Sequence, residues 1–264
     1  AEAGIETIRI GTKEMAFYPQ RFDETFFAML DSFHEKYPEV GINMMLHFEH
    51  PDEILAKGED GEYLSDKDGF LQWIPDTGAA MRELTKRGWM TVFNQAPIIK
   101  GINDDSDALR ILQREFKRAG GENHYFFCGR DIVAYKSFNV PIETVWNILN
   151  ESQKGLSGVE KHARLSITHY LGKTEVAAVT NEPIPGLKGA ENGVVIFKLL
   201  RNPADAPHLS KVCIVGRNPD AMWFDDYADR VLFDEAGLFD YERTHAHAGE
   251  AGVLSGIPQQ GGCL

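Results

Sequence analysis

A strand followed by a helix, repeated four times over the first 155 residues, constrains the fold of this chain more than any other feature. Apolar segments typical of strands lie at 5–10, 40–48, 89–93 and 124–128, and amphipathic segments follow them. Such alternation indicates a parallel sheet with helices packed outside it. Because a closed eight-stranded barrel needs about eight such units, we expect half a barrel whose first strand has an open edge.

Helix signals mark the segments that connect these strands. Asp23 precedes a helix stopped by Pro38. We expect its apolar face at Phe26, Met29, Leu30 and Phe33. A second helix is expected over 77–87, a third capped by Ser106, and a fourth opening at Pro141.

The alternation stops near residue 155, and strand-forming segments without intervening helices follow it. These segments lie at 165–169, 174–179, 193–200 and 211–216. We therefore expect an α/β half-barrel over residues 1–155 and a β-rich extension over 156–243. An acidic insertion at 52–76 is either functional or disordered, and the Gly- and Ala-rich stretch 244–264 is expected to be flexible.

The charge and the cysteine content exclude several classes of function. A net charge of -13 opposes binding to nucleic acid or to anionic membranes. No apolar run approaches the roughly 20 residues that span a bilayer, and the first residues are unlike a signal peptide. Three cysteines that lie far apart indicate a reducing compartment. We therefore expect a cytoplasmic protein that acts on a small molecule.

Four polar motifs fall where parallel strands end, which is where barrel enzymes gather their catalytic groups. They are IRIGTK at 8–13, LHFEHP at 46–51, FNQAP at 93–97 with KGIND at 100–104, and YFF at 125–127. In this order they resemble the lysine 2,3-aminomutase family, whose members carry IRIGTR, HFNHP, NQS followed by KGVND or RGVND, and YYIY. The resemblance runs from Glu6 to Lys173, and residues 165–227 are similar to one longer branch of that family.

The resemblance implies a partial (β/α)6 barrel of the radical S-adenosylmethionine type, with the strands of this chain as its third to sixth. The first strand of such a barrel precedes a Cys-x-x-x-Cys-x-x-Cys loop that holds a [4Fe-4S] cluster, and this sequence has no such loop. We expect a missing N-terminal half, or a partner chain in a homo-oligomer, to cover the open edge. Some members bind structural zinc, but Asp105 and the lone Cys263 stand here instead of its cysteines, so we expect no metal ligands.

The resemblance also assigns residues to cofactors. It places pyridoxal 5'-phosphate on Lys173, where the chemistry needs an amine that is neutral part of the time. The neighbouring Gly172 would let the backbone approach the cofactor ring. Arg9, His47 and Gln95 are the candidates for the S-adenosylmethionine side. Without the resemblance, Lys173 would be a surface lysine and His47 a satisfied core histidine.

The implied reaction moves an amino group from the α-carbon to the β-carbon of an amino acid. Cleavage of S-adenosylmethionine gives a 5'-deoxyadenosyl radical, which removes a hydrogen from the β-carbon. The amino group, held as an imine with pyridoxal phosphate, then migrates through a cyclic radical. The protein positions the reactants and excludes water.

Arg130 stands where the family has an aspartate that receives the distal ammonium of lysine. A guanidinium repels an ammonium and pairs with a carboxylate, so Arg130 predicts an acidic or neutral polar substrate. Asp131 could restore the preference for lysine. Alternatively, Arg130 pairs with Asp131 or another carboxylate and never touches the substrate.

Two further readings of the chain stay open. One is a binding or regulatory half-barrel without catalysis, which the absent cluster loop favours. The other is a lysine-dependent barrel enzyme such as an aldolase, against which the half-length barrel argues. The sequence upstream of Ala1 would separate the aminomutase from both alternatives, because a cluster motif there indicates the aminomutase.

Overall fold

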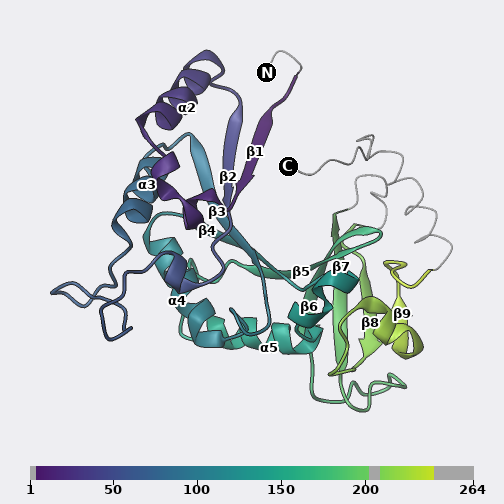
Figure 1. Cartoon of the computed structure of the whole chain (residues 1–264). Coiled ribbons are helices and arrows are strands. Elements are labelled where there is room, and N and C mark those ends of the chain that lie inside the picture. Colours follow the sequence, from purple (N-terminus) through teal and green to yellow (C-terminus); the bar gives the residue numbers. More distant parts are fainter. Residues whose placement is uncertain (1–3, 202–208, 241–264) are drawn as a thin grey trace. The chain divides into compact units, whose positions relative to one another are not determined.

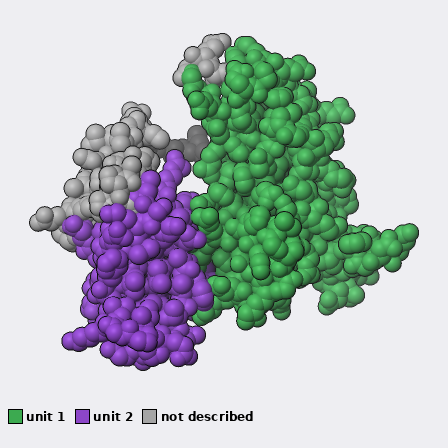
Figure 2. Space-filling view, turned by 180° about the vertical axis from the view of Figure 1, so that it is seen from behind, with its two compact units in different colours: residues 1–140, 147–165 green, residues 141–146, 166–264 purple. Residues whose placement is uncertain are grey.

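The computed structural model describes residues 4–201 and 209–240 and divides the chain into two compact units (Figure 2). Unit 1 comprises residues 1–140 and 147–165, and unit 2 comprises residues 141–146 and 166–264. The stretch expected to be flexible at 244–264, with Cys263, lies outside the described residues. No helix in the described ranges is long and apolar enough to cross a membrane.

Unit 1 contains four parallel strands that pair in the order of the chain (Figure 1). They are β1 (Thr7–Thr12), β2 (Gly41–Leu46), β3 (Met90–Pro97) and β4 (Glu122–Phe127). The prediction of four parallel strands before residue 155 is therefore confirmed. Closure of these strands into a radical S-adenosylmethionine-type barrel stays a prediction.

Helices connect these strands, and those between β1 and β4 lie along one side of them in Figure 1. The principal ones are α2 (Glu24–Lys36), α3 (Pro75–Thr85), α4 (Ser106–Arg118) and, after β4, α5 (Ile142–Gln153). Shorter turns are α1 (Glu14–Phe17), η1 (Pro19–Arg21), η2 (Pro51–Glu53) and η3 (Val133–Phe138). Each strand thus returns to the sheet through a helix, as parallel pairing requires.

Two details of the helices differ from the sequence-based expectation. The buried side chains of α2 are Phe27 and Leu30, whereas Met29 is 55% exposed. The side chain that caps α4 belongs to Asp105, whose Oδ1 accepts from the Ala108 amide at 2.7 Å, and not to Ser106. The reason is geometric, because an N-cap side chain reaches the amide three residues later.

The two faces of the parallel sheet differ in burial, because successive side chains of a strand point to opposite faces. One face is apolar and buried; it includes Ile42, Met44, Leu46, Val92 and Ala96. The other face carries Arg9, Asn43, Phe93, Gln95 and Tyr125, which are exposed or half-buried. The second face is therefore the one on which polar chemistry can occur.

Residues 52–76 form an antiparallel arm rather than a disordered insertion. Three isolated bridges hold it, namely Leu55 with Trp73, Lys57 with Tyr63 and Ser65 with Leu71. Its base is tied to α4, because Arg118 donates to the Leu71 carbonyl at 2.6 Å and Trp73 donates to the Glu115 carboxylate at 3.4 Å.

Unit 2 is built mainly from strands that pair antiparallel in chain order. These are β5 (Arg164–His169), β6 (Gly172–Val179), β7 (Val194–Arg201), β8 (Val212–Gly216) and β9 (Val231–Asp234). Phe224 and Tyr227 of η5 (Phe224–Arg230) pack their rings 5.0 and 5.7 Å from that of Phe197. The β-rich extension is confirmed, and β9 was not foreseen.

Candidate functional site

His47 and Gln95 meet at the carboxyl ends of β2 and β3. The Nε2 atoms of the two side chains lie 3.1 Å apart. Burial lowers the pKa of His47, Lys13 lowers it further, and Glu49 opposes the shift. A neutral imidazole whose Nε2 accepts from the Gln95 amide carries its proton on Nδ1. Two of the three residues expected on the S-adenosylmethionine side are thus in direct contact.

Arg9, the third of these residues, lies on the same face of the sheet but makes no such contact. Its strand position pairs with Asn43, and its side chain is exposed. Within the described ranges, no hydrogen bond or ion pair of the Arg9 guanidinium is found. Its assignment to the cofactor stays a prediction.

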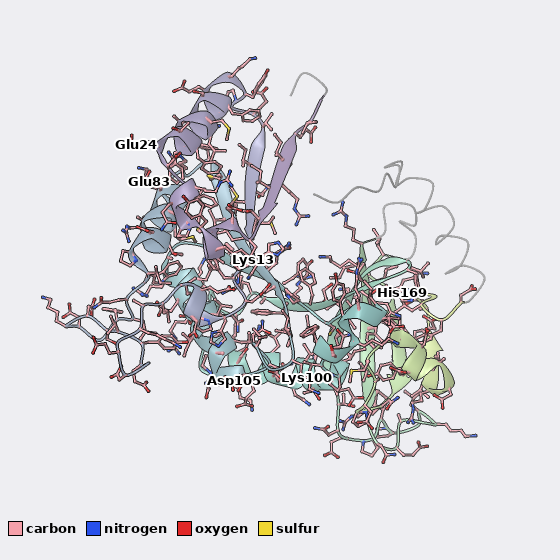
Figure 3. The ribbon with its side chains drawn as sticks, viewed as in Figure 1. Lys13, Glu24, Glu83, Lys100, Asp105 and His169 are labelled. Carbon is pink, nitrogen blue, oxygen red and sulfur yellow. The ribbon has the colours of Figure 1, made fainter. Side chains whose placement is uncertain are left out.

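A lysine and two glutamates gather beside His47, and sequence reasoning did not single them out. Lys13, which follows β1 and is labelled in Figure 3, lies 3.0 Å from a Glu49 oxygen and 2.7 Å from a Glu53 oxygen. All three side chains are mostly buried. The signal that could have found Lys13 and Glu49 is their place in the IRIGTK and LHFEHP motifs, directly after two strands, whereas Glu53 lies beyond both motifs.

An aromatic row lines the same face along β3 and β4. The rings of Phe93 and His124 lie 5.0 Å apart, those of His124 and Tyr125 4.1 Å apart, and those of Tyr125 and Phe127 5.8 Å apart. These rings are half-buried. The face can therefore cover an apolar or planar group beside the polar pair.

Lys173 lies in unit 2, as the second residue of β6. It is half-buried, and Thr168 and Arg201 are its cross-strand neighbours. A primary amine at a half-buried strand position can react with a carbonyl cofactor, and the assignment of pyridoxal phosphate to Lys173 stays a prediction. Gly172 has a φ of 135°, which residues with a Cβ rarely adopt. The turn alone therefore requires this glycine.

Arg130 and Asp131 follow β4 and are both exposed. Asp131 pairs with Lys136 at 2.9 Å. No carboxylate of the described residues pairs with the Arg130 guanidinium. The backbone carbonyl of Arg130 accepts a hydrogen bond from the Asn139 side chain at 3.0 Å. In the described part of the chain Arg130 is thus not engaged by Asp131, and its charge is available to a ligand.

The described cysteines do not fit an iron–sulfur cluster. Cys128 and Cys213 are buried. Burial raises the pKa of both thiols well above the usual range, and Asp234 adds to the shift at Cys213. A cluster needs thiolates, and the described ranges contain no group of three residues that could hold a metal. The Asp105 carboxylate, at the position of a family zinc ligand, caps α4 instead.

Comparison with known proteins connects this geometry to a family. No protein-family model matches the chain. A protein of Aquifex aeolicus (strain VF5) named "Putative L-lysine 2,3-aminomutase" is 29% identical over 237 residues, which are 89% of this chain and 54% of that protein. A second protein of that name and organism is 30% identical over 154 residues, 58% of this chain and 35% of the relative.

A third relative carries a different substrate in its name. The "Glutamate 2,3-aminomutase" of Clostridioides difficile (strain 630) is 26% identical over 155 residues, 59% of this chain and 31% of that protein. The chain thus spans about half the length of these relatives or less. Their names agree with the family that the four strand-end motifs predicted. By these likenesses and motifs, the chain is similar to proteins named as lysine and glutamate 2,3-aminomutases.

Proposed function

We propose that this chain is the carboxyl-terminal part of an amino-acid 2,3-aminomutase that uses S-adenosylmethionine, pyridoxal 5'-phosphate and a [4Fe-4S] cluster. The observation that carries the proposal is the likeness of 89% of the chain to a protein named as an aminomutase. The contact between His47 and Gln95 on the polar face of the sheet supports it. The cluster ligands would come from outside the described residues.

In this proposal the two units supply separate groups. His47, Gln95 and Arg9 would bind and orient polar parts of S-adenosylmethionine, while the aromatic row excludes water. Lys173 would hold pyridoxal phosphate, which when bound supplies the electronic support for moving an amino group between neighbouring carbons.

We further propose that the substrate is acidic or neutral rather than lysine. Arg130 has no described carboxylate partner, so a substrate carboxylate can pair with it. One relative of the chain is named a glutamate 2,3-aminomutase. A pocket that presents a guanidinium would disfavour a second ammonium, because like charges repel strongly at short range in a medium of low dielectric constant.

We also propose that another strand covers the outer edge of β1, which pairs with no other strand of the described residues than β2. This strand is first in the sheet order and pairs with β2 on one side. Edge strands present unpaired backbone groups that favour such pairing. The covering strand would come from a preceding βα unit or from a partner chain.

The cofactor assignment can be tested by trapping. The full-length protein, loaded with pyridoxal phosphate, is reduced with borohydride and digested, and the labelled peptide is mapped. We expect the pyridoxyl label on Lys173, and no label in Lys173→Ala. Lys136→Ala is the matched control and should keep the label. A label on Lys136, or none in an active enzyme, contradicts the assignment; a protein that binds no cofactor at all favours the regulatory half-barrel.

A further inference from the structure

We infer that Lys13, Asn94, Asn103 and Glu53 are positioning residues that hold residues 47–49 by side-chain hydrogen bonds in place of a sheet ladder. The β2 ladder ends at Leu46, one residue before His47. The inference rests on the proposed function only where it treats His47 and Gln95 as facing a cofactor. The contacts that hold the segment are a property of this chain.

The backbone of residues 47–49 finds its partners in side chains. The Lys13 ammonium donates to the His47 carbonyl at 3.1 Å. Asn94 engages both sides of Phe48, since its Oδ1 accepts from the amide at 2.8 Å and its Nδ2 donates to the carbonyl at 3.0 Å. These bonds take the place of the regular ladder beyond the end of the strand.

Two further side chains complete the set at Glu49. Its amide donates to a Glu53 oxygen at 2.6 Å, and its carbonyl accepts from Asn103 at 3.1 Å. Asn103 is fully buried and also donates to the Pro97 carbonyl at 2.9 Å. One side chain thus joins the segment after β2 to the end of β3.

Three of the four positioning residues belong to strand-end motifs near the polar pair, and Glu53 lies just beyond the LHFEHP motif. Asn94 adjoins Gln95 in the FNQAP motif, Asn103 belongs to KGIND, and Lys13 belongs to IRIGTK. Lys13 also pairs with Glu49 of LHFEHP and with Glu53 just beyond that motif, which ties the charges of two motifs together. Because the backbone before and after the ring is fixed, the imidazole of His47 is held against the Gln95 amide.

The outcome is one tautomer and one protonation state for His47. Gln95 donates to Nε2, and burial opposes the charged form. The charged groups that act on the imidazole are Glu49 and Lys13. If the segment is released, the ring moves away from Gln95 and toward water, so the preference for the Nδ1 proton is lost and the pKa returns toward its usual value.

The test is a histidine titration by nitrogen-detected NMR on this chain, with His47 assigned by His47→Gln. In the wild type we expect the Nδ1-protonated form and a pKa below 6.5. In Asn94→Ala and in Asn103→Ala we expect a mixture of tautomers and a rise in pKa. The matched control is Asn123→Ala, which removes another buried asparagine that donates to two backbone carbonyls, both at 2.9 Å.

The control variant Asn123→Ala should leave the tautomer and the pKa of His47 unchanged even if the protein becomes less stable. If either asparagine variant fails to fold, Lys13→Met tests the same segment from a partly exposed position. Its readout is a mixture of His47 tautomers, because removal of the Lys13 charge raises the pKa of His47 by itself. Wild-type His47 signals in all folded variants, or an equal change in Asn123→Ala, overturn the inference. No readout depends on turnover, so this result and a failure of the proposed aminomutase activity can be told apart.

Discussion

Arg130 is the residue on which the proposed substrate choice depends. It is exposed, and no described carboxylate pairs with it, whereas Asp131 is engaged by Lys136. In a full-length protein we expect glutamate to be converted in preference to lysine. Arg130→Asp should lower the kcat/KM for glutamate at least tenfold, because a charge-assisted hydrogen bond of about 1.5–3 kcal/mol is lost.

The control for this experiment is Lys136→Ala, which frees Asp131 without changing Arg130. It should leave the kcat/KM for glutamate within about fivefold of the wild type, since an exposed ion pair contributes about 1 kcal/mol or less. If the protein converts lysine in preference to glutamate, and Arg130→Asp does not change that preference, Arg130 does not bind the substrate.

Arg87 forms an ion pair with Asp31 whose contribution to stability depends on pH. Its guanidinium donates to both oxygens of Asp31, at 2.7 and 2.8 Å, and lies 4.6 Å from the Phe27 ring centroid. The hydrogen bond from Arg87 lowers the pKa of Asp31 below its usual 3.8. A carboxyl whose pKa is lowered in the folded state stabilises the protein above the unfolded pKa and loses that effect as the pH falls through the folded value.

We therefore expect Arg87→Met to reduce the free energy of unfolding at pH 7 more than Asp31→Asn, since the methionine also loses the bond to the Glu83 carbonyl. The difference between wild type and Asp31→Asn should shrink below about pH 3.8, where the unfolded carboxyl is protonated. Urea unfolding at pH 7 and pH 3 measures both effects. If the difference in unfolding free energy between wild type and Asp31→Asn is larger at pH 3 than at pH 7, the ion pair does not lower the pKa of Asp31.

The candidate polar pair could be named from the sequence, whereas the residues that hold it in position could not. His47 and Gln95 stand out because their motifs match a family. Asn94 and Asn103 look like ordinary turn residues until the parallel register brings both to the backbone after β2. That proximity depends on tertiary pairing, which a single sequence does not contain.

At the scale of elements, the cap of α4 distinguishes the structure from the sequence-based expectation. Asp105→Ala should lower the free energy of unfolding by about 1 kcal/mol, because the Ala108 amide loses its acceptor. Ser106→Ala should change it little, since Ser106 is already inside the helix. Urea denaturation of the two variants decides the matter, and a larger loss with Ser106→Ala would favour the original expectation.

The order of the elements could be predicted because periodicity is a local signal, but their faces and shortest members could not. In α2 both Phe26 and Phe27 are apolar, and only packing decides that Phe27 is buried. The four residues of β9, Val231–Asp234, are too few to show a period. The bridges of the arm at 52–76 join short polar segments that resemble a loop.

At the scale of the whole molecule, this chain by itself should take up no [4Fe-4S] cluster. Both described cysteines are buried with a raised pKa, and Cys263 is a single further thiol. After anaerobic reconstitution with iron and sulfide, we expect well below one iron per chain. A preparation that retains about four iron atoms per chain would contradict the proposal that the cluster ligands lie elsewhere.

The central claim is that the complete protein moves an amino group between neighbouring carbons. The direct measurement follows glutamate and lysine labelled with ¹³C throughout and ¹⁵N at the α-amino group, incubated anaerobically with the full-length protein, both cofactors and a reductant. We predict that the one-bond ¹³C–¹⁵N coupling moves from C2 to C3, only with S-adenosylmethionine present and with glutamate as the better substrate. A coupling that stays at C2 in every substrate, in a protein loaded with cluster and pyridoxal phosphate, would contradict the claim.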